Sequence, residues 1–159
     1  MLLAGEHPGA KFRTDCIVRI DALLDADVRQ FVDLTDFLDG LGPYVPILRE
    51  RAWSRKLQVA HHRFAIPDFD VPTSDTVRAA LDAIYGALDA GEPAYLHCWG
   101  GVGRAETVVG CLLRELGLTG TEALDLIDRK WSVMEKRARH PRSPETPDQI
   151  AFIERWPGV

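Results

Sequence analysis

The segment from His97 to Arg104 combines residue types that together can bind and attack an oxyanion: a cysteine, three glycines and an arginine. Glycines let successive backbone N–H groups point into one concavity that holds an anion. Arginine can donate two hydrogen bonds to a phosphate, and cysteines in such positive surroundings ionise at pKa values of roughly 3.5–7.5 rather than about 8.5. The sequence therefore predicts Cys98 as a thiolate nucleophile and Arg104 as a phosphate clamp, with no metal or cofactor.

The remaining residues of this loop are expected to bind the phosphate through their backbone. They are Trp99, Gly100, Gly101, Val102 and Gly103. The alternatives are an inert, buried cysteine or the glycine-rich turn of a nucleotide-binding fold. The Rossmann glycine spacing and the Lys-Ser/Thr pair of an ATP-binding loop are both absent. The pattern therefore favours the reactive cysteine.

The elements around the loop predict how it is positioned. An apolar strand over 93–97 leads into the loop, and a helix over 104–116 follows it. Elsewhere the patterns predict strands over 30–35 and 57–66, and helices over 17–27, over 74–90, from 119 and from 147. We expect residues 1–159 to form a single catalytic domain of the α/β class, with a central, mostly parallel sheet and helices on both faces. Ligands of such sheets bind beyond the carboxyl ends of the strands.

The composition is that of an ordinary globular domain. It is 46% hydrophobic and 27% charged, with a net charge of −5. This balance does not favour nucleic acid or an anionic membrane as a partner. No apolar run is long enough to span a bilayer, and the first residues do not resemble a signal peptide. With three cysteines and no disulfide framework, we expect a cytoplasmic protein.

The pattern His-Cys, five residues, Arg in 97–104 resembles the cysteine-dependent protein tyrosine phosphatase superfamily, and above all its small dual-specificity-like members. Four weaker matches follow in the family's order: Ala4–Gly9, Phe31–Thr35, Arg63–Asp68 and Ser143–Gln149. The resemblance implies hydrolysis of a phosphomonoester through a cysteinyl-phosphate intermediate. The substrate would be a phosphorylated protein, with phosphotyrosine favoured, or another phosphomonoester. Inorganic phosphate or a similar oxyanion would fit the loop.

The resemblance also implies supporting residues. Ile66-Pro-Asp68 matches the family's general acid, which protonates the leaving oxygen, with Asp70 as the alternative. Both aspartates could instead be turn residues. His97 would tune the ionisation of the cysteine, or would simply be a buried histidine with its hydrogen bonds satisfied. Gln149 would position the hydrolytic water, or would be the third residue of a helix capping box.

Two residues depart from the family pattern. Ala105 and Glu106 replace the usual Ser or Thr followed by Gly. The missing hydroxyl implies slow breakdown of the phosphocysteine, as in the phosphatases of regenerating liver, and Glu106 would compete with phosphate for the positive field of the helix. These departures keep two alternatives open: a phospho-binding pseudophosphatase module, or another thiolate oxyanion enzyme such as a sulfurtransferase or an arsenate reductase.

Other residues carry weaker expectations. Cys16 could form a protective disulfide with Cys98 under oxidation. His61 and His62 alternate on a predicted strand, so one should lie at the surface and one in the core. Trp53 is expected in the core. The basic cluster within 136–142 is either a solvated face or a surface that recruits an anionic substrate.

Overall fold

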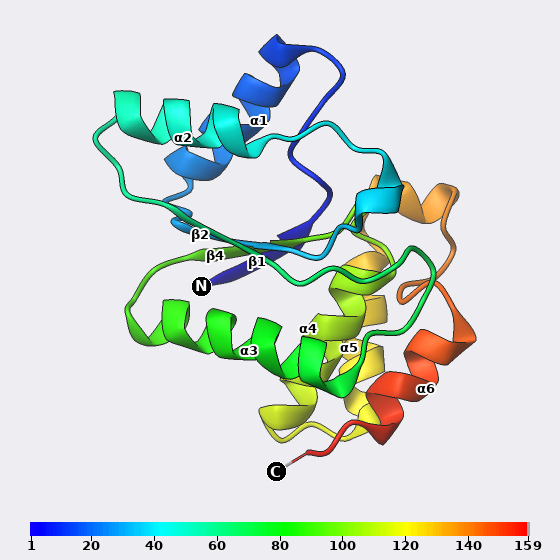
Figure 1. Ribbon diagram of the computed structural model, residues 1–159. Coiled ribbons are helices and arrows are strands. Elements are labelled where there is room, and N and C mark those ends of the chain that lie inside the picture. Colours follow the sequence, from blue (N-terminus) through cyan, green and yellow to red (C-terminus); the bar gives the residue numbers. More distant parts are fainter. Residues whose placement is uncertain (159) are drawn as a thin grey trace.

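The protein is seen in a computed structural model that describes residues 1–158. Four parallel strands form one sheet in the order β1-β4-β2-β3 (Figure 1). The strands are β1 (Leu2–Gly5), β2 (Gln30–Asp33), β3 (Ala60–Arg63) and β4 (Ala94–His97). Helices cover both faces of this sheet. The predicted α/β class with a parallel central sheet is therefore confirmed.

The helices divide between the two faces. Figure 1 shows α1 and α2 above the sheet and α3 to α6 below it. The α-helices are α1 (Arg13–Asp25), α2 (Val45–Ser54), α3 (Ser74–Asp89), α4 (Arg104–Glu115), α5 (Gly120–Trp131) and α6 (Pro147–Arg155). Two short 3₁₀ turns, η1 (Phe37–Asp39) and η2 (Glu135–Ala138), lie in the connections.

Alternation along the strands builds two separate cores. Phe31 and Tyr95 face α1 and α2, whereas Val32 and Leu96 face the other four helices. Because neighbouring residues of a strand point to opposite faces, one strand supplies both cores. All four residues of β4 are buried, as expected of an inner strand of a parallel sheet.

The carboxyl ends of the strands are aligned in one row. Gly5 pairs with His97, His97 pairs with Asp33, and Asp33 pairs with Arg63. Each strand therefore ends at the same edge of the sheet, and the segments that follow the strands meet there. Cys98 is the first residue beyond this row on β4.

Threonine side chains cap the first turns of two helices. Thr73 accepts a hydrogen bond from the backbone N–H of Thr76, and Thr119 forms a complete capping box with Glu122. Such caps satisfy backbone donors that have no partner within the helix, and each typically stabilises its helix by about 1 kcal/mol. The start of α3 is as predicted, and α3 ends at Asp89, one residue before the predicted end.

Several sequence-based expectations were wrong. The patterns did not predict β1, α2 or the two 3₁₀ turns, and α1 begins four residues before the predicted start. Trp53 is 86% exposed, not buried in the core. His61 and His62 are both partly buried, because each ring bonds a side chain of β2: His61 bonds Asp33, and His62 bonds Gln30. The predicted strand over 57–66 shortens to Ala60–Arg63.

Within the described chain, none of the helices is both long and apolar enough to cross a membrane.

Candidate active site

Cys98 lies at the floor of a cavity of about 440 Å³ at the carboxyl edge of the sheet. Its side chain is almost fully buried, and the Sγ atom accepts a hydrogen bond from the backbone N–H of Gly101 at 3.3 Å. Asp68, Arg104 and Gln149 line the same cavity. The structure therefore brings together in one cavity the four residues that the sequence analysis proposed as nucleophile, phosphate clamp, general acid and water-positioning glutamine.

In the loop after β4, most of the backbone carbonyl groups point away from the interior of the loop. Four of its carbonyl oxygens each accept a hydrogen bond from a group outside the loop: Trp99 O from His7 N (2.9 Å), Gly100 O from Lys136 Nζ (2.7 Å), Val102 O from Ser143 Oγ (2.5 Å) and Gly103 O from Thr107 N (2.9 Å). This arrangement leaves the N–H groups of the loop for its interior. Such a set of N–H groups is an anion-binding nest.

Gly101 is the tightest point of the loop. Its φ of +69° is in the left-handed region, and a Cβ atom there would lie 2.5 Å from the carbonyl carbon of Gly5. Only glycine fits this close approach. The end of β1 therefore contacts Gly101, whose N–H group donates a hydrogen bond to the Cys98 sulfur.

Arg104 is the first residue of α4 and is only 2% exposed. Its Nη1 atom donates to Asp39 Oδ2 and to the Ile66 carbonyl, both at 2.8 Å. Its Nη2 atom lies 2.9 Å from Asp68 Oδ1, close enough for an ion pair but without the geometry of a hydrogen bond. Within residues 1–158, Nη2 is therefore a buried donor without a hydrogen-bond acceptor, on a side chain that lines the Cys98 cavity.

Asp39 is a site residue that the sequence analysis missed. It lies in η1, and its carboxylate also accepts a hydrogen bond from the backbone N–H of Asp36 at 3.1 Å. The only sequence signal was the spacing of Asp36 and Asp39, which fits a capping box. Nothing in that local signal shows that the second aspartate contacts Arg104.

The structure separates the two candidate acids. Asp68 lines the Cys98 cavity, and its side chain is 35% exposed. The Asp70 carboxylate instead accepts a hydrogen bond from Val71 N at 2.8 Å, as a turn residue does. Phe69 lies between them with a φ of +61°, an unusual value for an aromatic residue, and also lines the cavity. The geometry favours Asp68 over Asp70.

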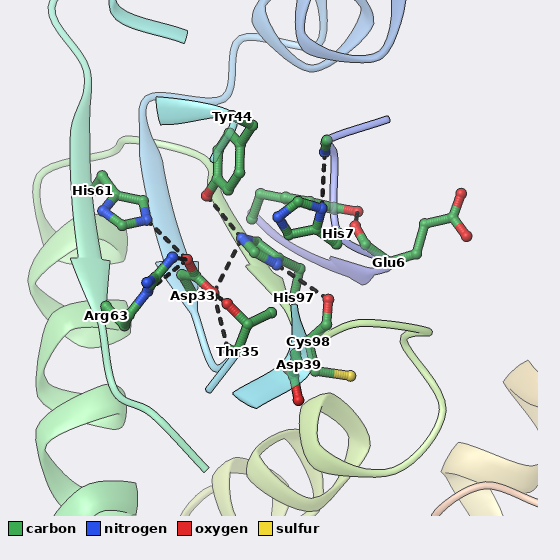
Figure 2. A network of polar contacts seen from close by, with 12 residues as sticks. Glu6, His7, Asp33, Thr35, Asp39, Tyr44, His61, Arg63, His97 and Cys98 are labelled. Carbon is green, nitrogen blue, oxygen red and sulfur yellow. Dashed lines mark hydrogen bonds and ion pairs between the residues drawn. The ribbon is translucent and has the colours of Figure 1, made fainter. Parts of the chain in front are cut away.

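His97 lies directly behind Cys98 and is fully buried (Figure 2). Its Nδ1 atom is 3.2 Å from the Cys98 carbonyl, and its Nε2 atom is 2.7 Å from the Tyr44 hydroxyl. A carbonyl can only accept, so Nδ1 must carry the proton and Tyr44 must donate to Nε2. Burial lowers the pKa of His97 to about 4, so the ring is neutral at pH 7.

Asp33 anchors this network on the neighbouring strand (Figure 2). Its buried carboxylate accepts hydrogen bonds from Thr35 Oγ1 (2.6 Å), Arg63 Nη2 (2.7 Å) and His61 Nε2 (3.1 Å). Burial alone would raise the pKa of Asp33, but the bonds from His61 and Thr35 hold it well below its ordinary value. A permanent buried charge therefore fixes the residues behind the loop that contains Cys98.

Gln149 serves as a capping residue and also lines the cavity. Its Oε1 atom accepts hydrogen bonds from the backbone of Glu145 and Thr146, and its Nε2 atom donates to the Asp70 carbonyl at 3.2 Å. The capping role expected from the sequence is confirmed. These contacts leave one N–H of the amide for a water molecule.

Two further residues lie away from the cavity. Glu106 lies in the first turn of α4, as the sequence indicates, but it lines a different cavity, behind the loop. Cys16 belongs to the core beneath α1 and α2, whereas Cys98 belongs to the core on the opposite face. Cys16 and Cys98 are both free thiols in this structure.

The mouth of the Cys98 cavity mixes aromatic and basic side chains. Phe69 and Trp99 are 60% and 49% exposed. Lys136, Arg139 and His140 of the predicted basic cluster also line the cavity. Part of this cluster therefore lies beside the site and not on a remote solvated face.

Comparison with known proteins agrees with this geometry. Residues 13–153 match the family described as PTP-SAK: Swiss Army Knife protein, DSP-PTPase phosphatase domain. This chain belongs to that family. The family is one of cysteine-based protein phosphatases of the dual-specificity kind, which are enzymes. The expected resemblance is thus confirmed at the level of the family.

Solved structures share the fold. A kinase-associated phosphatase is 17% identical with a TM-score of 0.74, and the match covers 96% of this chain and 82% of that one. Tk-PTP in its active form is 23% identical with a TM-score of 0.63, covering 95% of this chain and 94% of that one. PTPMT1 in complex with PI(5)P is 18% identical with a TM-score of 0.68, covering 98% of this chain and 89% of that one. At these identities the likeness is one of fold.

Proposed function

We propose that the protein hydrolyses phosphomonoesters through a phosphate ester of Cys98. The observation that carries this proposal is the pairing of two groups in one cavity: the Cys98 sulfur, and the buried Nη2 donor of Arg104 that lacks a hydrogen-bond acceptor. A phosphate seated over the sulfur would supply that acceptor. The N–H groups of the loop and the positive end of α4 would bind its other oxygens.

In the first step, the Cys98 thiolate attacks phosphorus and the bond from phosphorus to the leaving oxygen breaks. Asp68, protonated, transfers its proton to that oxygen, so an alcohol or phenol departs. Asp68 pairs with Arg104 in the structure described. Phosphate binding therefore has to draw the Asp68 carboxyl from Arg104 toward the leaving group.

In the second step, water attacks the phosphocysteine and the bond between sulfur and phosphorus breaks. Asp68, now a carboxylate, takes a proton from the water, and the remaining N–H of Gln149 orients it. Inorganic phosphate and the Cys98 thiolate are the products. Ala105 is fully buried and offers no hydroxyl to the departing sulfur. We therefore expect this second step to be slow.

Side chains at the mouth of the cavity support the choice of substrate class. Phe69 and Trp99 offer aromatic faces to an aryl phosphate, which favours phosphotyrosine. Lys136 and Arg139 add positive charge for a substrate with further anionic groups. Similar structures bind PI(5)P or are named for PP-IP hydrolysis, so a lipid or inositol phosphate is the competing class.

The test is hydrolysis of p-nitrophenyl phosphate, phosphotyrosine, phosphoserine and a phosphoinositide by the wild type and by Cys98→Ser. We expect Cys98→Ser to abolish hydrolysis of every substrate and Cys16→Ala to retain it, since Cys16 lies in the other core. Full activity of Cys98→Ser would refute the mechanism. Binding of phosphopeptides by the wild type without any turnover would instead identify a phospho-binding module.

A further inference from the structure

A second cavity, of about 650 Å³, lies behind the catalytic loop. It is bounded by β1, by α4 and α5, and by the outer side of the loop at Gly100 and Gly101. Most of its lining is apolar: Leu2, Leu3, Ala4, Val109, Ile127, Trp131 and Met134. Its volume is within the range of small-molecule sites, about 300–1,000 Å³.

The carboxyl of Glu106 lines this apolar cavity and has no hydrogen-bond or ion-pair partner among the described residues. Its side chain is partly buried, and no residue of the described chain pairs with it: burial is the one cause that raises its pKa, to about 7. A desolvated carboxylate without a partner costs free energy. A ligand that brings a positive group to this carboxylate would remove that cost.

The other charged groups of the cavity are already paired or lie at its mouth. Lys136 Nζ bonds Glu6 Oε2 at 2.6 Å and the Gly100 carbonyl at 2.7 Å. Lys130, on α5, is exposed to solvent. Tyr95 donates its hydroxyl to the Glu6 carbonyl at 2.6 Å. Among these groups, Glu106 is the one that favours a cation within the cavity.

The cavity also contacts the residues that hold the nucleophile. Lys136 and Gly100 form the wall between the two cavities. Gly101 lies against Gly5, and its N–H group holds the Cys98 sulfur. An occupant that moves Gly100 or Gly101 would therefore change the geometry at the sulfur.

We propose that this second cavity binds a small amphiphilic amine, whose apolar part contacts Trp131 and Met134 and whose ammonium group pairs with Glu106. The bound amine changes the rate of hydrolysis through Gly100 and Gly101. The effect on the rate of hydrolysis rests on the proposed function, whereas binding of the amine does not.

The test measures binding of 2-phenylethylamine to the full chain by calorimetry and by backbone amide NMR, with 2-phenylethanol as the uncharged probe. We expect the amine to shift the amide signals of β1, α5 and the catalytic loop. Loss of a hydrogen-bonded charge pair should weaken binding of the amine to Glu106→Gln by about tenfold or more. Asp125→Asn should bind as the wild type does, because the Asp125 carboxylate is exposed on α5 and does not line the cavity.

The pH dependence has a defined direction. Alkylammonium groups keep their proton up to about pH 10, whereas Glu106 must lose its proton to pair with one. Since burial raises the pKa of Glu106 to about 7, affinity for the amine should rise between pH 6 and pH 8. The alcohol should show no such rise.

Three results would overturn the site: equal affinity of Glu106→Gln for the amine, equal affinity of the wild type for the alcohol, or amide shifts confined to other parts of the chain. Hydrolysis of p-nitrophenyl phosphate separates the two parts of the proposal. Binding with an unchanged rate would refute the coupling to the loop. Binding by a protein that hydrolyses nothing would support the site and refute the proposed function.

Discussion

Arg104 and Asp39 form a buried ion pair in which Nη1 lies 2.8 Å from Oδ2, and both side chains are only 2% exposed. The two residues belong to α4 and η1, which are separated along the chain by α2, β3, α3 and β4. Breaking a buried pair by removing one partner typically costs about 3–5 kcal/mol, because the other charge stays buried. Asp39 thus fixes the orientation of the guanidinium group.

Replacing Asp39 tests this orienting role. Asp39→Ala leaves Nη1 with the Ile66 carbonyl alone, and we expect kcat/KM to fall about 100-fold, as for a misplacement of about 1 Å. Asp39→Asn keeps an accepting oxygen and should lose less, about 10-fold. Hydrolysis of p-nitrophenyl phosphate measures both values.

Phe37→Ser is the matched control, because Phe37 lies on the same 3₁₀ turn and is 90% exposed. It should leave kcat/KM unchanged. Wild-type kinetics in Asp39→Ala, or an equal loss in Phe37→Ser, would show that the ion pair does not orient the clamp.

Asp68→Asn separates acid catalysis from phosphate binding. The amide cannot protonate the leaving oxygen, so we expect kcat for phenyl phosphate to fall by about 100- to 1,000-fold. The loss should be smaller for p-nitrophenyl phosphate, whose leaving group needs less help. Inhibition by inorganic phosphate should not weaken, because the substitution removes a negative charge 2.9 Å from Arg104 Nη2.

Asp70→Asn provides the comparison for this experiment, since the Asp70 carboxylate bonds its own turn. We expect near-normal kinetics with both substrates. If Asp70→Asn rather than Asp68→Asn showed the dependence on leaving group, the assignment of the acid would be reversed.

His97 should lower the free energy of unfolding as the pH falls, because the buried ring resists protonation. Burial lowers the pKa of His97 from 6.5 to about 4, so the unfolded chain binds this proton first and acid favours unfolding. Between pH 7.5 and pH 5.0 the contribution of His97 to this loss should be on the order of 2 kcal/mol, taken as the difference between the wild type and His97→Asn because Glu106 contributes in the opposite direction. Urea denaturation at the two pH values measures it.

In His97→Asn this part of the pH dependence should disappear, whereas His62→Asn, which removes a ring outside the network behind Cys98, should keep it. The comparison concerns the slope against pH, so a lower overall stability of the variant does not affect it. An unchanged slope in His97→Asn would argue against a neutral, buried His97.

Glu106 should affect the free energy of unfolding with the opposite sign to His97, and Glu106→Gln tests this effect. Burial raises the pKa of Glu106 from 4.5 to about 7, so ionisation favours the unfolded chain as the pH rises through this window. The variant should therefore be close in stability to the wild type near pH 4.5 and exceed its stability by about 3 kcal/mol at pH 8. A constant difference across this range would contradict the partly buried carboxyl.

Much of the fold could be predicted from local signals. Thr119 and Thr146 each cap a helix, as the spacing to Glu122 and Gln149 predicts, and the apolar run before Cys98 is the buried strand β4. These signals are readable because caps and short buried strands depend on residues close in sequence. The loop from Cys98 to Arg104 is equally local, so its place between a strand and a helix could be predicted from the order of its residue types.

What could not be predicted depends on distant contacts. β1 is four residues long, and its pairing with β4 across some ninety residues leaves no local pattern. Asp39 and Tyr44 acquire their roles through Arg104 and His97, which no spacing reveals. The prediction that Trp53 is buried was wrong, because its size suggests burial whereas its position on α2 exposes it. The cavity at Glu106 arises where three elements leave a space between them.

The most direct test of the account is to trap the covalent intermediate. The wild type is mixed with excess p-nitrophenyl phosphate, denatured within milliseconds and digested, and the phosphorylated peptide is identified by mass spectrometry. The account predicts a burst of about one nitrophenolate per chain and phosphate on Cys98, with neither in Cys98→Ser. Phosphate on another residue, or continued turnover by Cys98→Ser, would contradict it.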